Sequence, residues 1–229
     1  MISSLVNSIK SLTFSAVQAI LRGLLGLLFR MRVTGRDRVP STGYILVANH
    51  LGWADPFLLL AYLPHHPRLF VLADKHGAFK HWWWRVVIEW SGRIIPIDRT
   101  TTFGAHAALR ACYAILERGE ALALFPEGVV GREESEIAPL KPGIGALCLR
   151  SGRPVLPVGI AGASELYLGR KLTLHIGHPF VPQRIGAHAQ ERIENATQQV
   201  GDALRSTLPP FVEEPIVHKR LRWLTQLFS

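Results

Sequence analysis

From about residue 33 onward, short apolar runs alternate along the chain with longer segments of helical periodicity. The apolar runs predict strands at 44–48, 68–73, 93–97, 120–125, 154–160 and 172–177. The segments between and after them predict helices at 56–63, 77–90, 103–118, 143–151 and 188–207. This alternation is typical of an α/β fold with a mostly parallel central sheet flanked by helices.

The length of 229 residues fits one medium-sized domain with some appended helix. With 48% hydrophobic and 19% charged residues, the chain can bury a sizeable core and is too apolar for disorder. We therefore expect a single active site in a domain at 33–210. An amphipathic helix at 1–32 precedes this domain, and a basic amphipathic tail at 211–229 follows it.

The net charge of +9 implies an anionic partner, which could be a nucleic acid, a phosphorylated metabolite or an acidic membrane. Much of this charge lies beside the most apolar segment, where residues 1–40 hold Lys10, Arg22, Arg30, Arg32, Arg36 and Arg38 against only Asp37. That arrangement favours an anionic membrane surface. Nucleic acid is the best rival from another class, but its recognition motifs are absent.

The segment from Leu12 to Phe29 is apolar enough to suggest a membrane span, but Arg22 at its centre would cost ~3 kcal/mol in a bilayer. At about 100° per residue, the polar positions form one narrow stripe, namely Ser4, Ser8, Ser11, Ser15, Gln18, Arg22 and Gly26. This pattern predicts an amphipathic helix lying on a membrane surface. The alternative is that its apolar face packs on the protein's own domain, and both can hold in part.

A signal peptide is disfavoured because the basic cluster at 30–38 follows the apolar region instead of preceding it. Cys112 and Cys148 lie in apolar helical patterns and could be buried thiols as easily as a disulfide bridge, and we infer a reducing compartment. We therefore expect association with the cytoplasmic face of the inner or plasma membrane. The tail from His218 to Phe228 mixes basic and apolar residues, which suits either a second surface contact or a docked terminal helix.

His50 and Asp55 follow directly on the predicted strand 44–48. In one continuous helix, residues five apart would point about 140° apart, but a strand-to-helix turn lets Asp55 fold back toward His50. Pro56 supports a helix beginning there. A carboxylate on one imidazole nitrogen leaves the other nitrogen free to act as a base. The alternative is that Asp55 caps the helix and His50 is an ordinary loop histidine.

Two further blocks also lie at the ends of predicted strands, Gly92 to Arg99 and Phe125 to Gly128. Ligands of open parallel sheets bind outside the carboxyl ends of the strands, so His50, Arg99 and Glu127 are expected to converge there. Arg99 could grip a phosphate with its planar guanidinium, and Glu127 could hold a hydroxyl or brace the loop. Taken singly, each is equally an ordinary surface arginine or turn carboxylate.

Together with Val155 to Val158, these blocks resemble the glycerolipid (lysophosphatidate-type, 1-acylglycerol-3-phosphate) O-acyltransferase family over roughly residues 33–180. The resemblance implies an acyltransferase domain at 33–210, an acyl-CoA or acyl-carrier-protein donor, a lysolipid acceptor, and neither metal nor cofactor. It also implies that His50 and Asp55 form the catalytic pair. The substrate-binding positions that it suggests are Lys75, Arg99, Glu127, Gly128 and Arg132.

The chain departs from this family after Gly128, where Val129, Val130 and Gly131 stand in place of the usual Thr-Arg-Ser. The family's arginine looks like a phosphate contact. Either Arg132 substitutes for it, or the acceptor lacks the phosphate monoester of lysophosphatidate. Lys75 and Lys141 could supply replacement charge, or they are solvated lysines.

Other functional classes find little support in the sequence. A serine hydrolase would need a Gly-x-Ser-x-Gly elbow, which is absent, and the dinucleotide-binding glycine pattern is incomplete. The remaining histidines lack the spacing of metal ligands. A non-catalytic lipid-binding relative stays open because of the altered block, although the intact His50 and Asp55 argue against it.

Overall fold

The computed structural model describes residues 2–74, 93–97, 102–131, 133–213, 215 and 218–226. The predicted helix 77–90 lies outside these residues. The described strands form one seven-stranded sheet in the order β1-β7-β6-β2-β5-β3-β4. Their bounds are β1 (Arg30–Thr34), β2 (Ile45–Ala48), β3 (Leu69–Asp74), β4 (Ile94–Ile97), β5 (Ala121–Leu124), β6 (Val155–Ala161) and β7 (Lys171–Ile176).

The sheet is mostly parallel, and β6 with β7 is its one antiparallel pair among the described strands. All six predicted strands are confirmed, with bounds that differ by at most one residue. Strand β1 is an addition that the sequence analysis missed. Its Arg-Met-Arg-Val-Thr sequence alternates charged and apolar residues over only five positions, directly after a long apolar helix.

The described helices are α1 (Ile2–Leu28), α2 (Asp55–Tyr62), α5 (Thr102–Glu117), α6 (Gly143–Ser151) and α7 (Ala189–Thr207), with short 3₁₀ turns η1 (Arg36–Arg38) and η2 (Arg222–Gln226). The four predicted helices that fall on described residues of the domain are confirmed. The N-terminal helix ends at Leu28 and not at residue 32, because the backbone from Arg30 onward pairs with β7.

Helices cover both faces of the sheet. Successive residues of a buried strand point to opposite faces, so the apolar side chains on each face pack against helices. On β2, Leu46 and Ala48 face one cluster of apolar side chains, to which α1 and α2 contribute. Ile45 and Val47 face a second cluster with side chains from α5, α6 and α7. All four strand residues are fully buried. The α/β fold class expected from the sequence is therefore confirmed.

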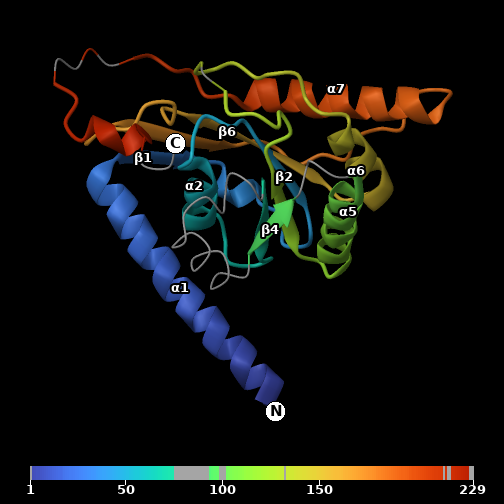
Figure 1. Ribbon diagram of the computed structural model, residues 1–229, viewed down its shortest axis with the longest axis horizontal. Coiled ribbons are helices and arrows are strands. Elements are labelled where there is room, and N and C mark those ends of the chain that lie inside the picture. Colours follow the sequence, from blue (N-terminus) through green and yellow to red (C-terminus); the bar gives the residue numbers. More distant parts are fainter. Residues whose placement is uncertain are drawn as a thin grey trace.

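Helix α1 crosses one face of the domain and extends beyond it at the N-terminal end (Figure 1). Its hydrogen bonds to the end of α2 come from Gln18 and Arg22. The Gln18 amide donates to the carbonyls of Leu60 at 2.8 Å and Leu63 at 3.0 Å, and the Arg22 guanidinium donates to the carbonyl of Ala61. These carbonyls lie at the end of α2, where a helix has no partners of its own for them. Two residues of the predicted polar stripe thus face the domain.

The opposite side of α1 is apolar and exposed. Ile20 is 62% exposed, Leu24 53% and Leu27 77%. Other apolar residues of the helix, such as Leu21 and Leu25, do pack on the domain core, so part of the apolar surface is buried and part faces outward. Within the described residues, no helix is both long and apolar enough to cross a membrane.

Strand direction decides where α1 joins the domain. Because β7 is antiparallel to β6 and β1 is parallel to β7, β1 begins at the sheet edge where β2 and β6 end. The end of α1 therefore lies at this edge, where the Gly169 amide donates to the Leu28 carbonyl at 2.7 Å. The loop between β6 and β7 and the end of α1 are neighbours at the carboxyl edge of β2.

Candidate active site

His50 lies in the loop that connects the end of β2 with the start of α2 at Asp55. Its Nδ1 is 2.8 Å from Oδ2 of Asp55. A carboxylate can only accept a hydrogen bond, so Nδ1 carries the proton and Nε2 keeps its lone pair. The Asp55 side chain is fully buried and the His50 side chain is 22% exposed. The imidazole can thus meet a ligand while its carboxylate partner is shielded from water.

Asp55 does not act as a conventional helix cap. The N-cap position belongs to Ala54, and no side chain caps the helix there. Instead, Oδ2 of Asp55 accepts the backbone N–H groups of Leu51 at 2.6 Å and Gly52 at 2.8 Å, in addition to His50. The carboxylate folds the loop around itself and so fixes the position of the imidazole.

The Asp55 carboxylate is subject to two opposing effects. Burial raises the pKa of Asp55 above its ordinary value, while the hydrogen bonds from His50, Gly52 and Leu51 act against that rise. Oδ1 of Asp55 is buried without a hydrogen-bond partner among the described residues.

Asn49 fixes the start of the loop. Its side chain is fully buried, its Nδ2 donates to the Ile160 carbonyl at 2.9 Å, and its Oδ1 accepts the Ile160 N–H at 2.7 Å. The side-chain amide thus continues the pairing of β2 with β6 beyond the last strand residue. The backbone is free to turn away from the sheet directly before His50. No role was predicted for Asn49 from the sequence, although its position directly after a buried strand indicated a place at the site.

Glu127 braces the same loop from the turn after β5. Its side chain is 2% exposed, Oε1 accepts the His50 backbone N–H at 2.9 Å, and Oε2 accepts the Ala138 N–H at 2.8 Å. Burial raises its pKa, and the hydrogen bonds from Ala138 and His50 oppose the rise. Both oxygens point to backbone groups. Of the two roles expected for Glu127, the geometry therefore favours bracing the loop.

The turn after β5 supports His50 in other ways. The Phe125 ring stacks on the imidazole with centroids 4.3 Å apart. The Gly131 N–H donates to the His50 carbonyl at 2.6 Å. Gly128 has a φ of 73° and closes the turn through its N–H to the Phe125 carbonyl at 3.1 Å. Glycine suits this left-handed conformation, so Gly128 has a structural role in shaping the turn.

Glu134 joins this turn to a third loop. Its carboxylate accepts the N–H groups of Gly162 at 2.9 Å and Ser164 at 3.0 Å, and the Ser164 hydroxyl at 2.6 Å. These residues follow β6. The sequence offered no signal for this contact, since Glu134 lies in an irregular segment. The loops after β2, β5 and β6 are thus bound to one another around His50.

The structure brings some of the predicted site residues together. His50, Asp55 and Glu127 meet at one edge of the sheet, as expected from their positions after strands. Lys75, Arg99 and Arg132 lie outside the described residues, so their convergence remains a prediction. The Lys141 side chain is exposed at the end of the loop that leads into α6. Among the described residues, no group of three His, Cys, Asp or Glu side chains could hold a metal ion.

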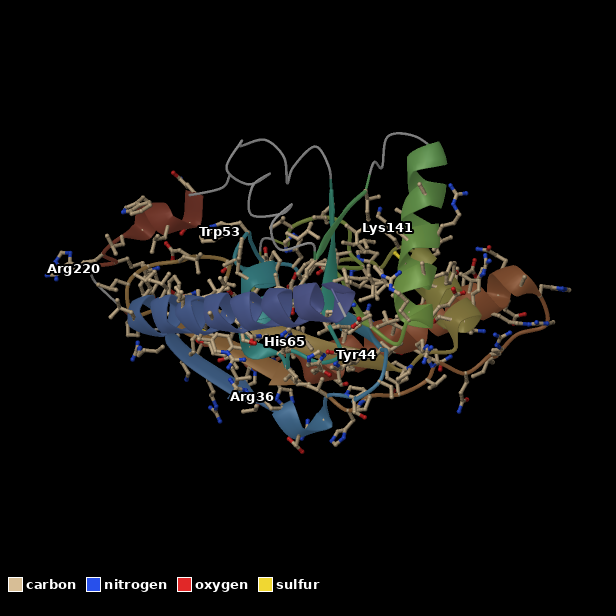
Figure 2. The ribbon with its side chains drawn as sticks, turned by 90° about the horizontal axis from the view of Figure 1, so that it is seen from below. Arg36, Tyr44, Trp53, His65, Lys141 and Arg220 are labelled. Atoms are coloured by element: carbon tan, nitrogen blue, oxygen red, sulfur yellow. The ribbon has the colours of Figure 1, made fainter. Side chains whose placement is uncertain are left out.

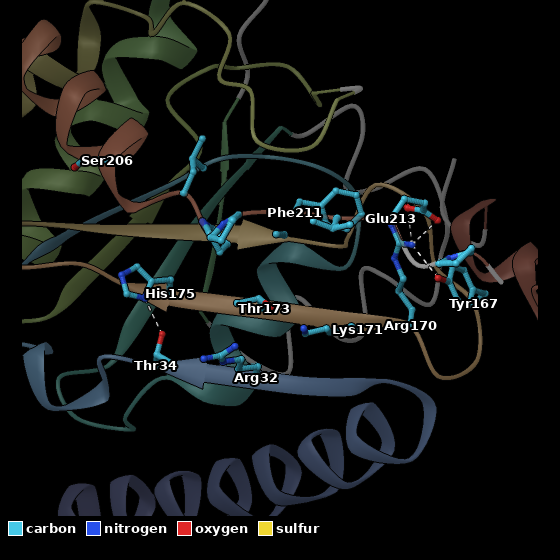
Figure 3. Close-up of a pocket in the computed structure, with 16 residues that line it drawn as sticks. Arg32, Thr34, Tyr167, Arg170, Lys171, Thr173, His175, Ser206, Phe211 and Glu213 are labelled. Carbon is cyan, nitrogen blue, oxygen red and sulfur yellow. Dashed lines mark hydrogen bonds and ion pairs between the residues drawn. The ribbon is translucent and has the colours of Figure 1, made fainter.

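A cavity of about 640 Å³ lies elsewhere, over the open face of β1 and β7 (Figure 3). Arg170, which donates to Tyr167 and to both oxygens of Glu213, lies at one end. At the other end the Thr34 hydroxyl is 2.7 Å from Nδ1 of His175. None of the predicted site residues lines this cavity. We therefore place the candidate active site at His50, where the carboxyl ends of the strands and the three loops meet.

Residues 30–161 match the family model described as Acyltransferase, which is more than half of the chain. The chain is 22% identical over 143 residues to the chloroplastic 1-acyl-sn-glycerol-3-phosphate acyltransferase LPAT1 of Arabidopsis thaliana. That alignment covers 60% of this chain and 38% of the plant protein, so the chain spans well under half of its relative.

A solved structure has a similar fold. The 1-acyl-sn-glycerophosphate acyltransferase PlsC of Thermotoga maritima superimposes with a TM-score of 0.66 at 18% identity. The match covers 90% of this chain and 84% of that one. At this identity the comparison establishes a shared fold, with the mostly parallel sheet and its flanking helices.

Proposed function

The chain belongs to the acyltransferase family, and on that premise we propose that it transfers a fatty acyl group from a thioester to the hydroxyl of a lysophospholipid. Membership confirms the resemblance that the four sequence blocks indicate. The donor in this proposal is acyl-CoA or an acyl-carrier protein, the acceptor is a lysolipid such as lysophosphatidate, and the pathway is phospholipid biosynthesis. The observation that carries the proposal is the 2.8 Å contact between His50 and Asp55 beside three interlocked loops.

In the proposed mechanism, Nε2 of His50 removes the proton from the acceptor hydroxyl as its oxygen attacks the thioester carbonyl carbon. A carbon–oxygen bond forms, and the carbonyl becomes a tetrahedral oxyanion. The intermediate then collapses, the carbon–sulfur bond breaks, and the leaving thiolate takes the proton from His50. Asp55 stabilises the imidazolium between these steps. A positioned base of this kind contributes about 10²–10⁴-fold in rate, and no metal or cofactor takes part.

The identity of the acceptor depends on the altered block after Gly128. Val129 is 55% exposed and Val130 54%, at the positions where the resembling family carries threonine and arginine. An exposed apolar pair gives no charge for a phosphate monoester. This observation favours a second candidate, an acceptor whose head group lacks that phosphate. Arg99, Arg132 and Lys75 are the other cations expected to bind the phosphate. Lysophosphatidate stays the first candidate acceptor because of the family.

The outward face of α1 supports association with an anionic membrane surface. A helix whose polar residues bind the domain leaves Ile20, Leu24 and Leu27 exposed to solvent, which is the arrangement expected of a lipid-facing surface. The basic residues that follow, Arg30 and Arg32, suit the anionic cytoplasmic leaflet. We propose that α1 lies on the cytoplasmic face of the inner or plasma membrane, and that the anionic partner implied by the charge is lipid and not nucleic acid.

Acyl transfer is tested by following thioester consumption with a panel of lysolipids, with and without a phosphate monoester. His50→Ala is expected to lower kcat about 10²–10⁴-fold, because the base is lost. The exposed His178, which follows β7, provides the matched control His178→Ala, with wild-type rates expected. Equal rates for wild type and His50→Ala would contradict the role of His50 as the base. Equal rates at the uncatalysed background would favour a non-catalytic lipid-binding protein.

The same panel resolves the acceptor. If Val130 marks an acceptor without a phosphate monoester, wild type should prefer such lysolipids, and Val130→Arg should shift the preference toward lysophosphatidate. A wild-type preference for lysophosphatidate that Val130→Arg leaves unchanged would contradict this second candidate.

A further inference from the structure

The C-terminal segment 218–226 packs directly on the loop that carries His50. Leu224 is 7% exposed and belongs to the same apolar cluster as Leu51 and Ala54. The indole N–H of Trp53 donates to the Leu224 carbonyl at 2.9 Å. Trp53 lies between His50 and Asp55 in the sequence, and Figure 2 shows it next to η2. The last described part of the chain therefore contacts the loop from which the catalytic pair projects.

The segment is also fastened to the loop between β6 and β7. The Thr225 hydroxyl accepts the Leu166 N–H at 2.8 Å and donates to the Leu166 carbonyl at 3.1 Å. The Leu168 N–H donates to the Arg220 carbonyl at 2.9 Å. Lys219 forms an ion pair with Glu165 of the same loop. These contacts define the docked position of the segment on the loop.

The other side of the segment faces outward. Trp223 is 57% exposed and Leu221 39%, and between them the side chain of Arg222 is 71% exposed. The segment carries the cations Lys219, Arg220 and Arg222 and no acidic residue. Exposed tryptophan among basic residues is the composition that binds the headgroup region of an anionic bilayer.

This outward surface adjoins the exposed end of α1. Leu168, 41% exposed, binds the segment through its backbone, and its neighbour Gly169 binds the Leu28 carbonyl of α1. In both Figure 1 and Figure 2, η2 lies at the C-terminal end of α1. The C-terminal end of α1, the loop between β6 and β7, and η2 therefore lie at one corner of the molecule.

We propose that residues 218–226 couple an anionic lipid surface to the catalytic loop, with Leu224 and Trp53 as positioning residues. The inference rests on the proposed acyl transfer and adds to it a regulation of the same site. A lipid surface that binds the segment in its docked position stabilises that position, since a ligand stabilises the state it prefers. Docking holds the loop through Trp53, so the catalytic rate depends on lipid even when both substrates are dissolved.

The test uses the full chain with a short-chain lysolipid and an acyl-CoA, both below their aggregation limits, with and without vesicles of phosphatidylglycerol and phosphatidylcholine. Vesicles should raise kcat of the wild type severalfold with little change in KM. Leu224→Ala should lower kcat about tenfold and remove the response to vesicles, because a truncated core leucine weakens docking. Leu224→Met should restore most of both, since it nearly conserves volume.

Two further variants separate positioning from folding. Trp53→Phe keeps an aromatic ring and removes the indole N–H, and it should weaken the vesicle response while the thermal unfolding midpoint stays near that of wild type. Trp223→Ser should lower vesicle affinity about tenfold, whereas the control Ile185→Ser, at an exposed position before α7, should leave it unchanged. Wild-type kcat in Leu224→Ala, or a wild type that ignores vesicles, would overturn the coupling.

These outcomes are distinct from failure of the proposed function. If wild type consumes no thioester with any acceptor in the panel, acyl transfer itself is wrong. If wild type is active but neither vesicles nor Leu224→Ala change its kcat, acyl transfer stands and only the coupling is wrong.

Discussion

The loop of residues 49–55 and helix α1 are both held by polar side chains that bind backbone groups, but the results differ. In the loop, Asn49, Asp55 and Glu127 bind backbone groups from several segments and hold one imidazole in place. In α1, Gln18 and Arg22 bind carbonyls of a single neighbour, α2. The loop is fixed on several sides, whereas the helix is fixed along one side and leaves an apolar surface outward.

The difference shows how one small domain can combine a precisely positioned catalytic base with a surface that binds lipid. Catalysis by a positioned base tolerates little displacement, since small errors in geometry cost rate. Adhesion to a lipid surface needs only exposed apolar area and positive charge. Inward polar contacts leave Leu24 and Leu27 of α1 exposed for that purpose. Substitutions in the two regions should therefore change different measured quantities.

The largest effect is expected at Asp55. Asp55→Asn keeps the size of the side chain but no longer stabilises the imidazolium or fixes the tautomer of His50, so kcat should fall about 10²–10⁴-fold. Steady-state thioester consumption measures this loss. Asp202→Asn, on the exposed side of α7, is the matched control and should have wild-type kcat. An unchanged kcat in Asp55→Asn would show that the pair is only structural.

A smaller effect on rate and a clear effect on stability are expected at Glu127. Glu127→Ala leaves the half-buried N–H groups of His50 and Ala138 without this acceptor, which should cost about 1–3 kcal/mol of unfolding free energy. Denaturant unfolding measures this cost, and kcat should fall while KM stays close to wild type. Glu127→Gln keeps one acceptor and should lose less. A raised KM at unchanged kcat would instead make Glu127 a substrate contact.

The smallest effects sharpen the contrast within α1. Gln18→Leu removes two hydrogen bonds to α2 and should lower the unfolding free energy by about 1–2 kcal/mol, while vesicle affinity changes little. Leu27→Ser, on the exposed side, should change stability by less than about 0.5 kcal/mol but weaken vesicle binding about tenfold. Unfolding curves and vesicle sedimentation measure the two quantities. If Leu27→Ser binds vesicles as wild type does, the outward face is not the lipid contact.

Much of the domain was predictable because its signals are local. Buried strands read as apolar runs, and Pro56 indicated where α2 begins. The turn between strand and helix made contact between His50 and Asp55 geometrically available. Glu127 was expected at the same edge because it follows the end of a predicted strand. Strand β1 was missed because its arginines, Arg30 and Arg32, face outward on an open part of the sheet and interrupt the apolar pattern.

Other features depend on partners far away in the chain. Asn49 binds Ile160 across 111 residues, and Trp53 binds Leu224 across 171. No spacing rule connects such positions. The amphipathic pattern of α1 likewise predicted a helix with two unlike sides, but not which side would meet the domain. That choice depends on the free carbonyls at the end of α2, which accept Gln18 and Arg22.

The antiparallel pairing of β6 with β7 has a consequence for how a lipid substrate in the bilayer would reach His50. Had β7 run parallel to β6, β1 would begin at the opposite edge of the sheet, and the exposed leucines at the end of α1 would lie far from His50. With the observed direction, the proposed lipid-facing corner and the base share one edge. A lysolipid could then present its hydroxyl to His50 while its acyl chain remains largely in the bilayer, so little of the energy of lipid extraction would be added to the barrier of the reaction.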